Sequence, residues 1–346
     1  MNALGARIAQ LIEAQGPISV AEFMALANDA YYASRDPLGR QGDFITAPEI
    51  SQVFGELIGL WIVQAWAAQG RPRAKRLVEL GPGRGTLMAD ALRAARVVPE
   101  FLDGLEVVLV EASPRLRAAQ AERVPGARWA DRFDGSLGDA PLFLIANEFF
   151  DALPVRQFVK TAAGWRERMV TLGANRALAF ALSPLAVPGP ADAPLGGVME
   201  MCPAARAIAA DIARAVQTTG GAALIVDYGY DAPGFGETLQ AVRGHAFADI
   251  LAHPGETDLS THVDFSALAA AAADAAAFGP VTQGAFLERL GIFARVERLV
   301  AANPPAASSL RSGAERLIHP DEMGKMFKVL AILPASAPPP PGFREC

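Results

Sequence analysis

The stretch that decides the fold runs from Arg76 to Thr86 and reads RLVELGPGRGT. It opens with a short, mostly apolar run of the kind that forms a strand buried on both faces. Three glycines then stand at alternate positions, Gly81, Gly83 and Gly85, and a helical pattern begins at Thr86. Glycine permits positive φ and close backbone approach, and a helix N-terminus offers unpaired N–H groups. This strand–turn–helix therefore predicts a site for a nucleotide-like cofactor.

The spacing of the glycines favours S-adenosylmethionine (SAM) over a dinucleotide. Dinucleotide sites prefer the pattern G-x-G-x-x-G, in which the helix N-terminus receives a pyrophosphate. Here the pattern is G-x-G-x-G, and Thr86 stands where the last dinucleotide glycine would fall. The strand also carries Glu79, whose carboxylate would repel a pyrophosphate but attract the cationic methionine end of SAM. An NAD site and a turn that only connects strand to helix remain the alternatives.

Strands and helices alternate through much of the remaining chain. Apolar runs predict further buried strands at 105–110, 127–130, 141–146 and 222–226, with helices at 86–96, 114–123 and 204–217. This alternation predicts an α/β fold, a doubly wound Rossmann-like sheet. Glu111 follows the second strand, where an acid can accept hydrogen bonds from both ribose hydroxyls of SAM or NAD.

Other segments flank or interrupt this pattern. Residues 1–70 predict a helical extension, with helices at 5–15, 18–30 and 49–69, and Ser19 with Glu22 resembles a capping box. The Rossmann-like domain is expected over 71–333, with insertions at about 155–200 and 230–290. The first insertion mixes short β-like pieces with a Pro/Gly-rich loop at 183–197, and the second begins loop-rich and continues as helices at 265–277 and 282–290. Two runs, 296–301 and 327–333, are candidates for a closing strand pair, and the proline-rich residues 334–346 predict a flexible tail.

The bulk composition narrows the class of protein. The net charge of -6 gives no reason to expect nucleic acid as a partner. The two cysteines, Cys202 and Cys346, match no metal spacing and favour a reducing compartment. No apolar run approaches the length of a membrane span, and residues 1–13 lack the features of a signal peptide. We therefore expect a cytoplasmic protein without membrane insertion.

Several long strings carry a resemblance to a known family. They are Gly42–Ser51 (GDFITAPEIS), Phe54–Glu56 (FGE), Glu79–Thr86, Asn147–Pro154 (NEFFDALP), Asp227–Tyr230 (DYGY), Thr261–Phe265 (THVDF), Met323–Gly324 and Phe327–Leu330 (FKVL). On these strings, which span nearly the whole chain, it resembles the MidA family of bacterial and mitochondrial methyltransferases linked to the assembly of respiratory complex I.

The resemblance implies a fold, a reaction and a partner. The fold is that of a Rossmann-like SAM-dependent methyltransferase. The mitochondrial members imply symmetric dimethylation of an arginine in the quinone-side core subunit of complex I, which would make that subunit the protein partner. Since the chain shows no mitochondrial presequence, the resemblance implies a bacterial member in the cytoplasm, whereas the eukaryotic relatives work in the mitochondrial matrix.

The string Asn147–Pro154 follows a buried strand and holds the candidate catalytic acids. Ligands of open α/β sheets bind at the carboxyl ends of the strands, so Asn147 is expected at the cofactor and Glu148 and Asp151 at the acceptor. A guanidinium is charged at any ordinary pH, and carboxylates can draw its charge toward one side. The alternatives are that Glu148 caps the next segment and that Asp151 is a surface acid before a turn.

Further candidates rest on weaker signals. Asp43, Thr46 and Glu49 precede the apolar helix and predict a lid over cofactor and acceptor, although Thr46 and Glu49 also suit a helix start. Trp129 could stack on adenine and Asp131 could accept from its amino group, or Trp129 could be core.

His262 is the best general-base candidate among four histidines that form no metal signature. Besides an arginine methyltransferase, the sequence leaves open a SAM-binding assembly chaperone without turnover and a methyltransferase of small molecules.

Overall fold

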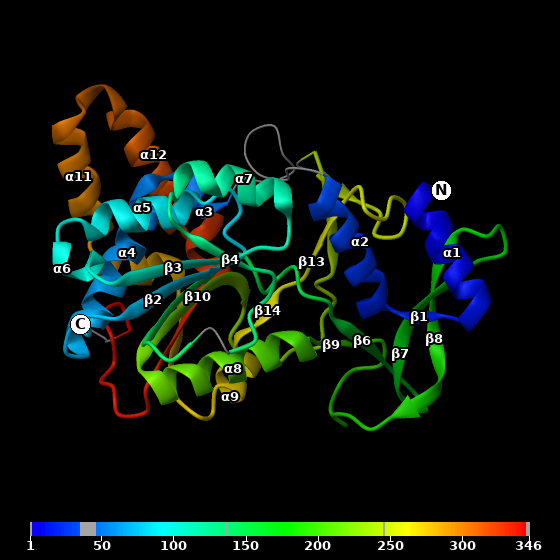
Figure 1. The fold of residues 1–346 in the computed structure, drawn as a ribbon. Coiled ribbons are helices and arrows are strands. Elements are labelled where there is room, and N and C mark those ends of the chain that lie inside the picture. The colour runs from blue at the N-terminus through cyan, green and yellow to red at the C-terminus, as the bar shows by residue number, and fades with distance from the viewer. Residues whose placement is uncertain (1, 35–45, 136–137, 245, 344–346) are drawn as a thin grey trace. The chain divides into compact units, whose positions relative to one another are not determined.

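The computed structural model describes residues 2–34, 46–135, 138–244 and 246–343 (Figure 1). The chain divides into two compact units. Unit 1 comprises residues 1–44, 151–205 and 232–262, and unit 2 comprises residues 45–150, 206–231 and 263–346. The helical extension predicted over 1–70 thus contributes to both units, and the insertion predicted at 155–200 lies within unit 1.

Unit 2 is built on one large sheet. Its strand order is β15-β16-β10-β5-β2-β3-β4, and β14 pairs with the end of β10. Strands β10, β5, β2, β3 and β4 run parallel, whereas β16 lies antiparallel between β10 and β15. The bounds are β2 (Lys75–Leu80), β3 (Leu105–Val110), β4 (Arg128–Ala130), β5 (Leu142–Asn147), β10 (Gly221–Tyr230), β14 (Val263–Asp264), β15 (Ala276–Thr282) and β16 (Phe327–Leu333).

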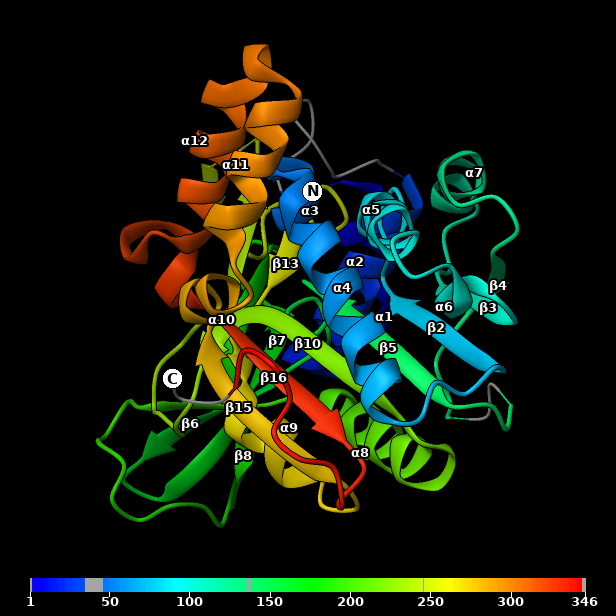
Figure 2. The ribbon, with the colours of Figure 1, turned by 90° about the vertical axis from the view of Figure 1, so that its left-hand side faces the viewer.

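Helices cover both faces of this sheet, as the alternating pattern predicts. Helices α4 and α5 lie on one face and α8 and α9 on the other (Figures 1 and 2). The central strands β2 and β5 are buried along their whole length because they are apolar runs covered on both sides. The helices are α3 (Ala47–Ile50), α4 (Gln52–Ala68), α5 (Thr86–Ala95), α6 (Pro99–Leu102), α7 (Pro114–Arg123), α8 (Pro203–Thr219, which begins in unit 1), α9 (Phe265–Ala271), α10 (Gln283–Arg289), α11 (Ile292–Ala302) and α12 (Ala307–Ile318).

The apolar helix predicted at 49–69 is two helices. Ser51 separates α3 from α4 in an extended conformation, and its hydroxyl accepts a 3.3 Å hydrogen bond from Val53 N. Helix α4 then packs tightly against α5, since a Cβ built on Gly59 would lie 2.5 Å from Ala91 Cα. This close packing places α5, the helix that follows the glycine loop, firmly in the core.

The closing strand pair predicted from the sequence is half wrong. Val296–Ala301 lies inside α11, and the strand that pairs with β16 is β15. The helix predicted at 265–277 accordingly ends at Ala271, and β15 begins at Ala276. The alanine-rich run 269–277 has high helix propensity, and here pairing with β16 overrides it at its end.

Residues 334–343 of the predicted flexible tail are packed on unit 2. Trp61 Nε1 donates a 3.0 Å hydrogen bond to Pro341 O, and Arg289 donates one of 3.0 Å to Gly342 O. The Phe343 ring lies 5.4 Å from that of Phe286. The last three residues lie outside the described part of the chain.

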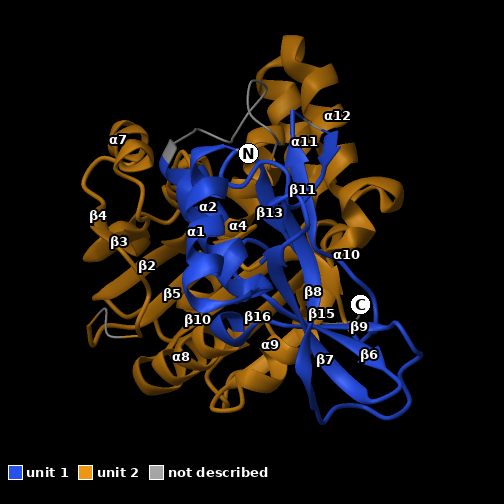
Figure 3. Cartoon of the chain, turned by 90° about the vertical axis from the view of Figure 1, so that its right-hand side faces the viewer, with its two compact units in different colours: residues 1–44, 151–205, 232–262 blue, residues 45–150, 206–231, 263–346 orange. Residues whose placement is uncertain are grey.

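In the part that the structure describes, unit 1, blue in Figure 3, combines the helices α1 and α2 with two small antiparallel sheets. The first sheet has the order β1-β7-β6-β9 with β8 on β7, and the second has the order β12-β11-β13. The elements are α1 (Ala3–Gln15), β1 (Ile18–Ser19), α2 (Val20–Ser34), β6 (Arg156–Thr161), β7 (Gly164–Leu172), β8 (Leu178–Val187), β9 (Val198–Met201), β11 (Gln240–Arg243), β12 (Ala246–Ala248) and β13 (Asp258–Ser260). The three β-like pieces predicted in 155–200 are confirmed, whereas the sheet β11–β13 lies in a segment predicted as loop.

Local capping and one buried amide hold the N-terminal helices of unit 1. The capping box is confirmed, because Glu22 N donates to Ser19 Oγ at 3.1 Å and Ser19 N donates to Glu22 Oε2 at 2.8 Å. The Asn28 side chain donates to Leu259 O at 2.8 Å and accepts from Leu259 N at 3.2 Å. Asn28 thereby joins α2 to β13.

Candidate active site

The glycine loop joins β2 to α5 in unit 2. Gly81, Gly83 and Gly85 all have positive φ, at +61°, +52° and +79°. Gly85 N donates to Pro82 O at 2.7 Å, and Gly85 is the N-cap of α5 without a side-chain cap. A Cβ built on Gly81 would lie 3.0 Å from Phe149 Cδ2. The loop therefore has the tight, side-chain-free shape that a nucleotide-like cofactor requires.

Glu79 of β2 is buried with 3% of its surface exposed. Burial raises its pKa to about 8, although a hydrogen bond from the Met88 backbone opposes the shift. Its Oε2 has no hydrogen-bond partner among the described residues. A buried carboxyl group with an unused oxygen suits a ligand that brings a cation or a donor. The site thus fits the methionine end of SAM. The sequence suggested an ionised carboxylate here, whereas the raised pKa means that Glu79 holds its proton at neutral pH until a cation is present.

Glu111, at the end of β3, is fixed by neighbours on α7 and at the end of β4. Its backbone N donates to Ala130 O at 3.0 Å, and its Oε1 accepts from Ser113 N at 2.7 Å. Its Oε2 accepts a longer bond, 3.4 Å, from Gln120 Nε2. Burial raises the pKa of Glu111, and the hydrogen bonds from Ser113 and Gln120 oppose that shift. Glu111 thus lies directly after β3, the position from which it is predicted to accept hydrogen bonds from the ribose hydroxyls of SAM.

Gln120 of α7 is a residue that the sequence reasoning missed. Its Nε2 donates to Gly83 O at 2.7 Å, and its Oε1 accepts from Trp129 Nε1 at 2.8 Å. Trp129 is half-buried and packs on the core of unit 2, while Asp131 is exposed and pairs with Arg117 at 2.6 Å. No short motif surrounds a lone glutamine, so only its complete burial reveals its importance.

Asn147 is the last residue of β5, and Glu148 follows it directly. The Glu148 backbone N donates to Val226 O at 2.9 Å, and the residue has a φ of +49°, which is unusual outside glycine. Its Oε1 accepts from Asn147 Nδ2 at 3.1 Å and from Ala47 N at 3.0 Å. The Oδ1 of Asn147 is buried and has no hydrogen-bond partner among the described residues. Glu148 thus caps the first residue of α3, a helix that precedes it in the chain, and not the segment that follows it as the alternative supposed.

Asp227 of β10 is the second residue that the sequence reasoning missed. It is completely buried, and its Oδ2 accepts from Phe149 N at 3.2 Å and from Phe150 N at 3.0 Å. These bonds satisfy the backbone of the turn that directly follows Glu148. Strained backbone persists only where its surroundings hold it, and Asp227 supplies that support. Asp227 belongs to the string DYGY, one of those that carry the family resemblance, but the sequence suggested no role for it.

Asp151 and His262 belong to unit 1. Asp151 is buried, and its backbone O accepts from Thr261 N at 2.9 Å. His262 N donates to Thr238 Oγ1 at 2.9 Å. Unit 1 therefore brings Asp151 against the residue that precedes His262. Glu148, three residues before Asp151 in the chain, belongs to unit 2.

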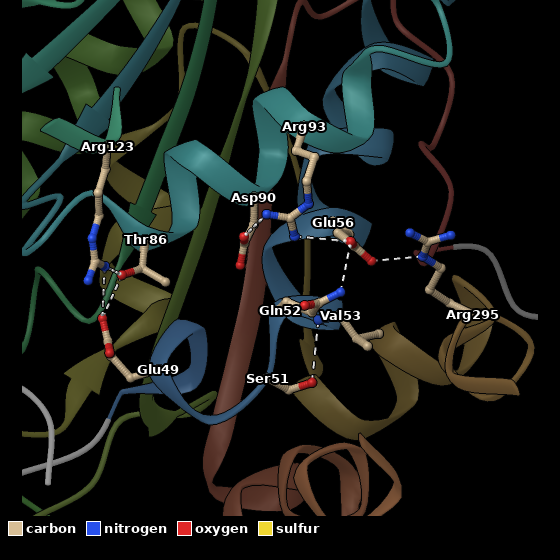
Figure 4. A network of polar contacts seen from close by, with 10 residues as sticks. All are labelled: Glu49, Ser51, Gln52, Val53, Glu56, Thr86, Asp90, Arg93, Arg123 and Arg295. Atoms are coloured by element: carbon tan, nitrogen blue, oxygen red, sulfur yellow. Dashed lines mark hydrogen bonds and ion pairs between the residues drawn. The ribbon is translucent and has the colours of Figure 1, made fainter. Parts of the chain in front are cut away.

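The three residues predicted to form a lid, Asp43, Thr46 and Glu49, have different outcomes in the structure. Asp43 lies outside the described residues. Thr46 is the N-cap of α3 but makes no side-chain cap, and Pro48 and Glu49 lie in its first turn. Glu49 Oε1 instead accepts a 2.6 Å bond from Thr86 Oγ1, and Arg123 contacts both side chains (Figure 4). A predicted lid residue and a predicted cofactor residue thus meet.

A second network in Figure 4 links the helices behind the glycine loop. Glu56 of α4 is buried, and its Oε1 accepts from Arg93 Nη2 at 3.1 Å while its Oε2 accepts from Arg295 Nε at 2.7 Å. Arg93 also pairs with Asp90 at 2.6 Å. This network connects α4, α5 and α11 within unit 2. It gives Glu56 of the string Phe54–Glu56 a structural role.

The described ranges contain neither a candidate metal site nor a candidate membrane span. There, no three His, Cys, Asp or Glu side chains gather as a metal site would require. Among the residues that the structure describes, no helix is both long and apolar enough to cross a bilayer.

The sheet order and the glycine loop define a class I SAM-dependent methyltransferase, so the predicted fold class is confirmed and SAM is the cofactor. A family model described as "Putative S-adenosyl-L-methionine-dependent methyltransferase" matches residues 57–281. The chain belongs to this family, the MidA or COG1565 group, as the resemblance implied. The NAD alternative is thereby set aside.

Relatives and a solved structure agree with this assignment. The chain is 42% identical to the mouse protein named "Protein arginine methyltransferase NDUFAF7, mitochondrial", with 93% of this chain and 82% of the mouse protein covered. The human protein of the same name is 40% identical, with 93% and 81% covered. A crystal structure of a COG1565 superfamily member from Burkholderia thailandensis, bound to S-adenosyl-homocysteine, gives a TM-score of 0.87 at 29% identity. It covers 99% of this chain and 95% of that chain.

Proposed function

We propose that this methyltransferase modifies an arginine side chain of a partner protein. More specifically, the product is a symmetrically dimethylated arginine in the quinone-side core subunit of complex I. This modification supports complex I assembly and, in a bacterium, takes place in the cytoplasm. The names of the mouse and human relatives support an arginine as acceptor. The observation that carries the proposal is Glu148, an acid held in a left-handed conformation at the carboxyl end of β5.

Glu148 is suited to bind and polarise a guanidinium. The guanidinium is charged at any working pH and delocalises that charge over three nitrogens, so none of them is a good nucleophile. A fixed carboxylate attracts the positive charge toward the nitrogens it contacts. The bonds from Asn147 Nδ2 and Ala47 N hold the Glu148 carboxylate in place before an acceptor arrives. Bound SAM supplies the electrophilic methyl group.

Asp151 and His262 are the candidates for the remaining roles. We propose that Asp151 is a second carboxylate that binds the guanidinium. Asp151 or His262 then accepts the proton that leaves the guanidinium during methyl transfer. Support comes from unit 1, where Asp151 O bonds Thr261 N directly before His262. Glu200 supports the same region, because it accepts from Thr238 N at 3.1 Å while Thr238 Oγ1 accepts from His262 N.

The test is methyl transfer from labelled SAM to purified core subunits of complex I, followed by mass spectrometry of the product. We expect symmetric dimethylarginine at one position of the quinone-side subunit, and no product when that arginine is replaced by lysine. Label on a lysine, or no label on any subunit while a small molecule from the same extract is methylated, would contradict the proposed acceptor.

Variants of the acids separate catalysis from folding. Glu148→Gln keeps the shape and the bond from Ala47 N, and we expect it to bind SAM normally while turnover falls by roughly a hundredfold or more. Glu167→Gln is the matched control, since Glu167 is an acid of unit 1 that pairs with Arg156 on β6. If Glu148→Gln lost SAM binding together with turnover, Glu148 would be a support of the fold.

A further inference from the structure

Gln120 joins three groups that are predicted to line the SAM site. It lies on α7 with 0% of its surface exposed. Its Nε2 is 2.7 Å from Gly83 O and 3.4 Å from Glu111 Oε2, and its Oε1 is 2.8 Å from Trp129 Nε1. One buried amide therefore contacts the glycine loop, the acid after β3 and the tryptophan of β4. All four residues belong to unit 2.

The partners of Gln120 allow only one orientation of its amide. Gly83 O accepts and cannot donate, whereas the Trp129 indole N–H donates and cannot accept. The NH₂ group of Gln120 must therefore face Gly83, and its oxygen must face Trp129. A glutamine carries two N–H donors, so its second hydrogen is available to the Glu111 carboxylate. This matching of donors and acceptors distinguishes Gln120 from an amide that merely fills space.

The backbone of α7 packs against the loop at the same place. A Cβ built on Gly85 would lie 3.5 Å from both Cα and Cγ of Gln120 and 3.4 Å from Val124 Cγ2. The Gly83 carbonyl is thus held from one side by the side-chain amide while the loop rests on the helix. Removing the amide would take away the hydrogen bonds that it makes with the part-buried Gly83 O and Trp129 Nε1.

We propose that Gln120 is the positioning residue for the adenosine half of the SAM site. It orients Gly83, Glu111 and Trp129 together, so that the affinity for SAM depends on a neutral amide at this position. The inference rests on the proposed assignment of Gly83, Glu111 and Trp129 to the cofactor. It concerns the methyl donor and is independent of the methyl acceptor.

The charges around Glu111 make a carboxylate at position 120 unfavourable. Burial already raises the pKa of Glu111, and the bond from Gln120 helps to keep it ionised. A cation beside Glu111 is Arg117, which donates to the Glu111 backbone O at 2.7 Å and pairs with Asp131. A second carboxylate facing Glu111 and the Gly83 carbonyl would therefore meet negative charge on both sides.

Two variants of Gln120 test the inference by calorimetric titration with SAM. Gln120→Met keeps the length of the side chain and removes the amide, so we expect the Kd for SAM to rise by roughly ten- to a hundredfold at every pH. Gln120→Glu is expected to show a similar loss at pH 8. The ratio of its Kd to that of the wild type should fall toward 1 as the pH is lowered to 6. A protonated carboxyl group at position 120 can again donate a hydrogen bond to Gly83 O.

Matched controls distinguish a positioning role from loss of folding. Gln283 is an equally buried amide of unit 2 that donates to Leu317 O at 2.8 Å, so Gln283→Met should leave the Kd for SAM unchanged. The protein has four tryptophans, and the indole N–H resonance of Trp129, assigned through Trp129→Phe, should shift in Gln120→Met without SAM. The other three indole resonances should stay in place.

The outcomes separate this inference from the assignment on which it rests. If Glu111→Gln and Gly83→Val leave SAM affinity unchanged, the site itself is wrongly assigned. If those variants lose affinity while a folded Gln120→Met binds SAM like the wild type, Gln120 only fills the core and the inference is overturned.

Discussion

The Glu49 carboxylate accepts a 2.6 Å hydrogen bond from the Thr86 hydroxyl. This bond ties α3 to the first residue of α5, directly after the glycine loop. At its other end, α3 donates Ala47 N to Glu148. A helix of four residues thus touches both the helix of the cofactor loop and the proposed acid of the acceptor site. Predictions for both sides of the site follow from these contacts.

Replacing Thr86 by Val should remove the bond to Glu49 and lower the free energy of unfolding by about 1 kcal/mol. Glu49→Gln should cost less, because an amide oxygen can still accept from Thr86. A double-mutant cycle in urea with Thr86→Val and Glu49→Ala should give a coupling of about 1 kcal/mol. Strictly additive effects would show that the contact contributes nothing, for instance because Arg123 replaces either partner.

Glu79 makes the stability of the protein without SAM depend on pH. Its folded pKa of about 8 lies above the ordinary value of 4.5, so the folded state holds a proton that the unfolded state releases. The stabilisation is complete below about pH 4.5 and is lost as the pH rises to about 8, at up to ~1.4 kcal/mol per pH unit. Glu79→Gln should show a smaller decline over this window in urea titrations.

SAM binding should release a proton from Glu79 near neutral pH. A cation close to the buried carboxyl group favours its ionised form, so binding should tighten as the pH approaches 8. Calorimetry at pH 7 in buffers of different ionisation enthalpy measures the released proton. The Glu79→Gln variant is the control and should release none from this site. Equal proton release by both proteins would exclude Glu79 as the group that responds to SAM.

Gly83→Val should prevent SAM binding in a folded protein. Gly83 has a φ of +52°, which a β-branched residue rarely adopts, and its carbonyl must keep its place against Gln120. Circular dichroism verifies the fold, and calorimetry measures the affinity. Gly70→Val is a control outside the site, since Gly70 also has positive φ and a Cβ there meets no atom within 4 Å. Normal SAM affinity in a folded Gly83→Val would count against the assigned loop.

Glu56→Gln should weaken the fold and spare the cofactor site. The Glu56 side chain is 2% exposed and serves both Arg93 and Arg295, so losing its charge should lower the free energy of unfolding by about 2 kcal/mol. The Kd for SAM should not change in the folded variant. Arg311→Gln is a surface comparison, because its pair with Glu297 is exposed and should matter little.

Much of the fold of unit 2 was predictable because its central strands are long apolar runs. The elements β2, α5, β3, α7 and β5 lie within a residue or two of their predicted ranges. The short strands β11, β12 and β13 were missed, since three or four residues carry too little periodicity to stand out from a loop. The edge strand β15 was missed because its first two residues were predicted as the end of one helix, and residues 278–281 were predicted as the connection to the next helix.

The candidate site could be proposed from the sequence where a short string carries its chemistry. The glycine loop, Glu79, Glu111 and Glu148 all follow or end predicted strands, so the rule for parallel sheets located them. Gln120 and Asp227 act through burial and long-range hydrogen bonds, which no local pattern records. Asp131 follows β4 as expected and its exposed side chain pairs with Arg117, while its contact with the adenine amino group stays a prediction.

The bond between Asn28 and Leu259 has a consequence for synthesis of the chain. These residues are 231 positions apart, yet the core of unit 1 needs both α2 and β13. Domains tend to fold from the N-terminus as the chain leaves the ribosome. Here α1 and α2 are made well before residues near 259 and must wait for them before they gain their partner, so unit 1 contains early helices and is still completed late.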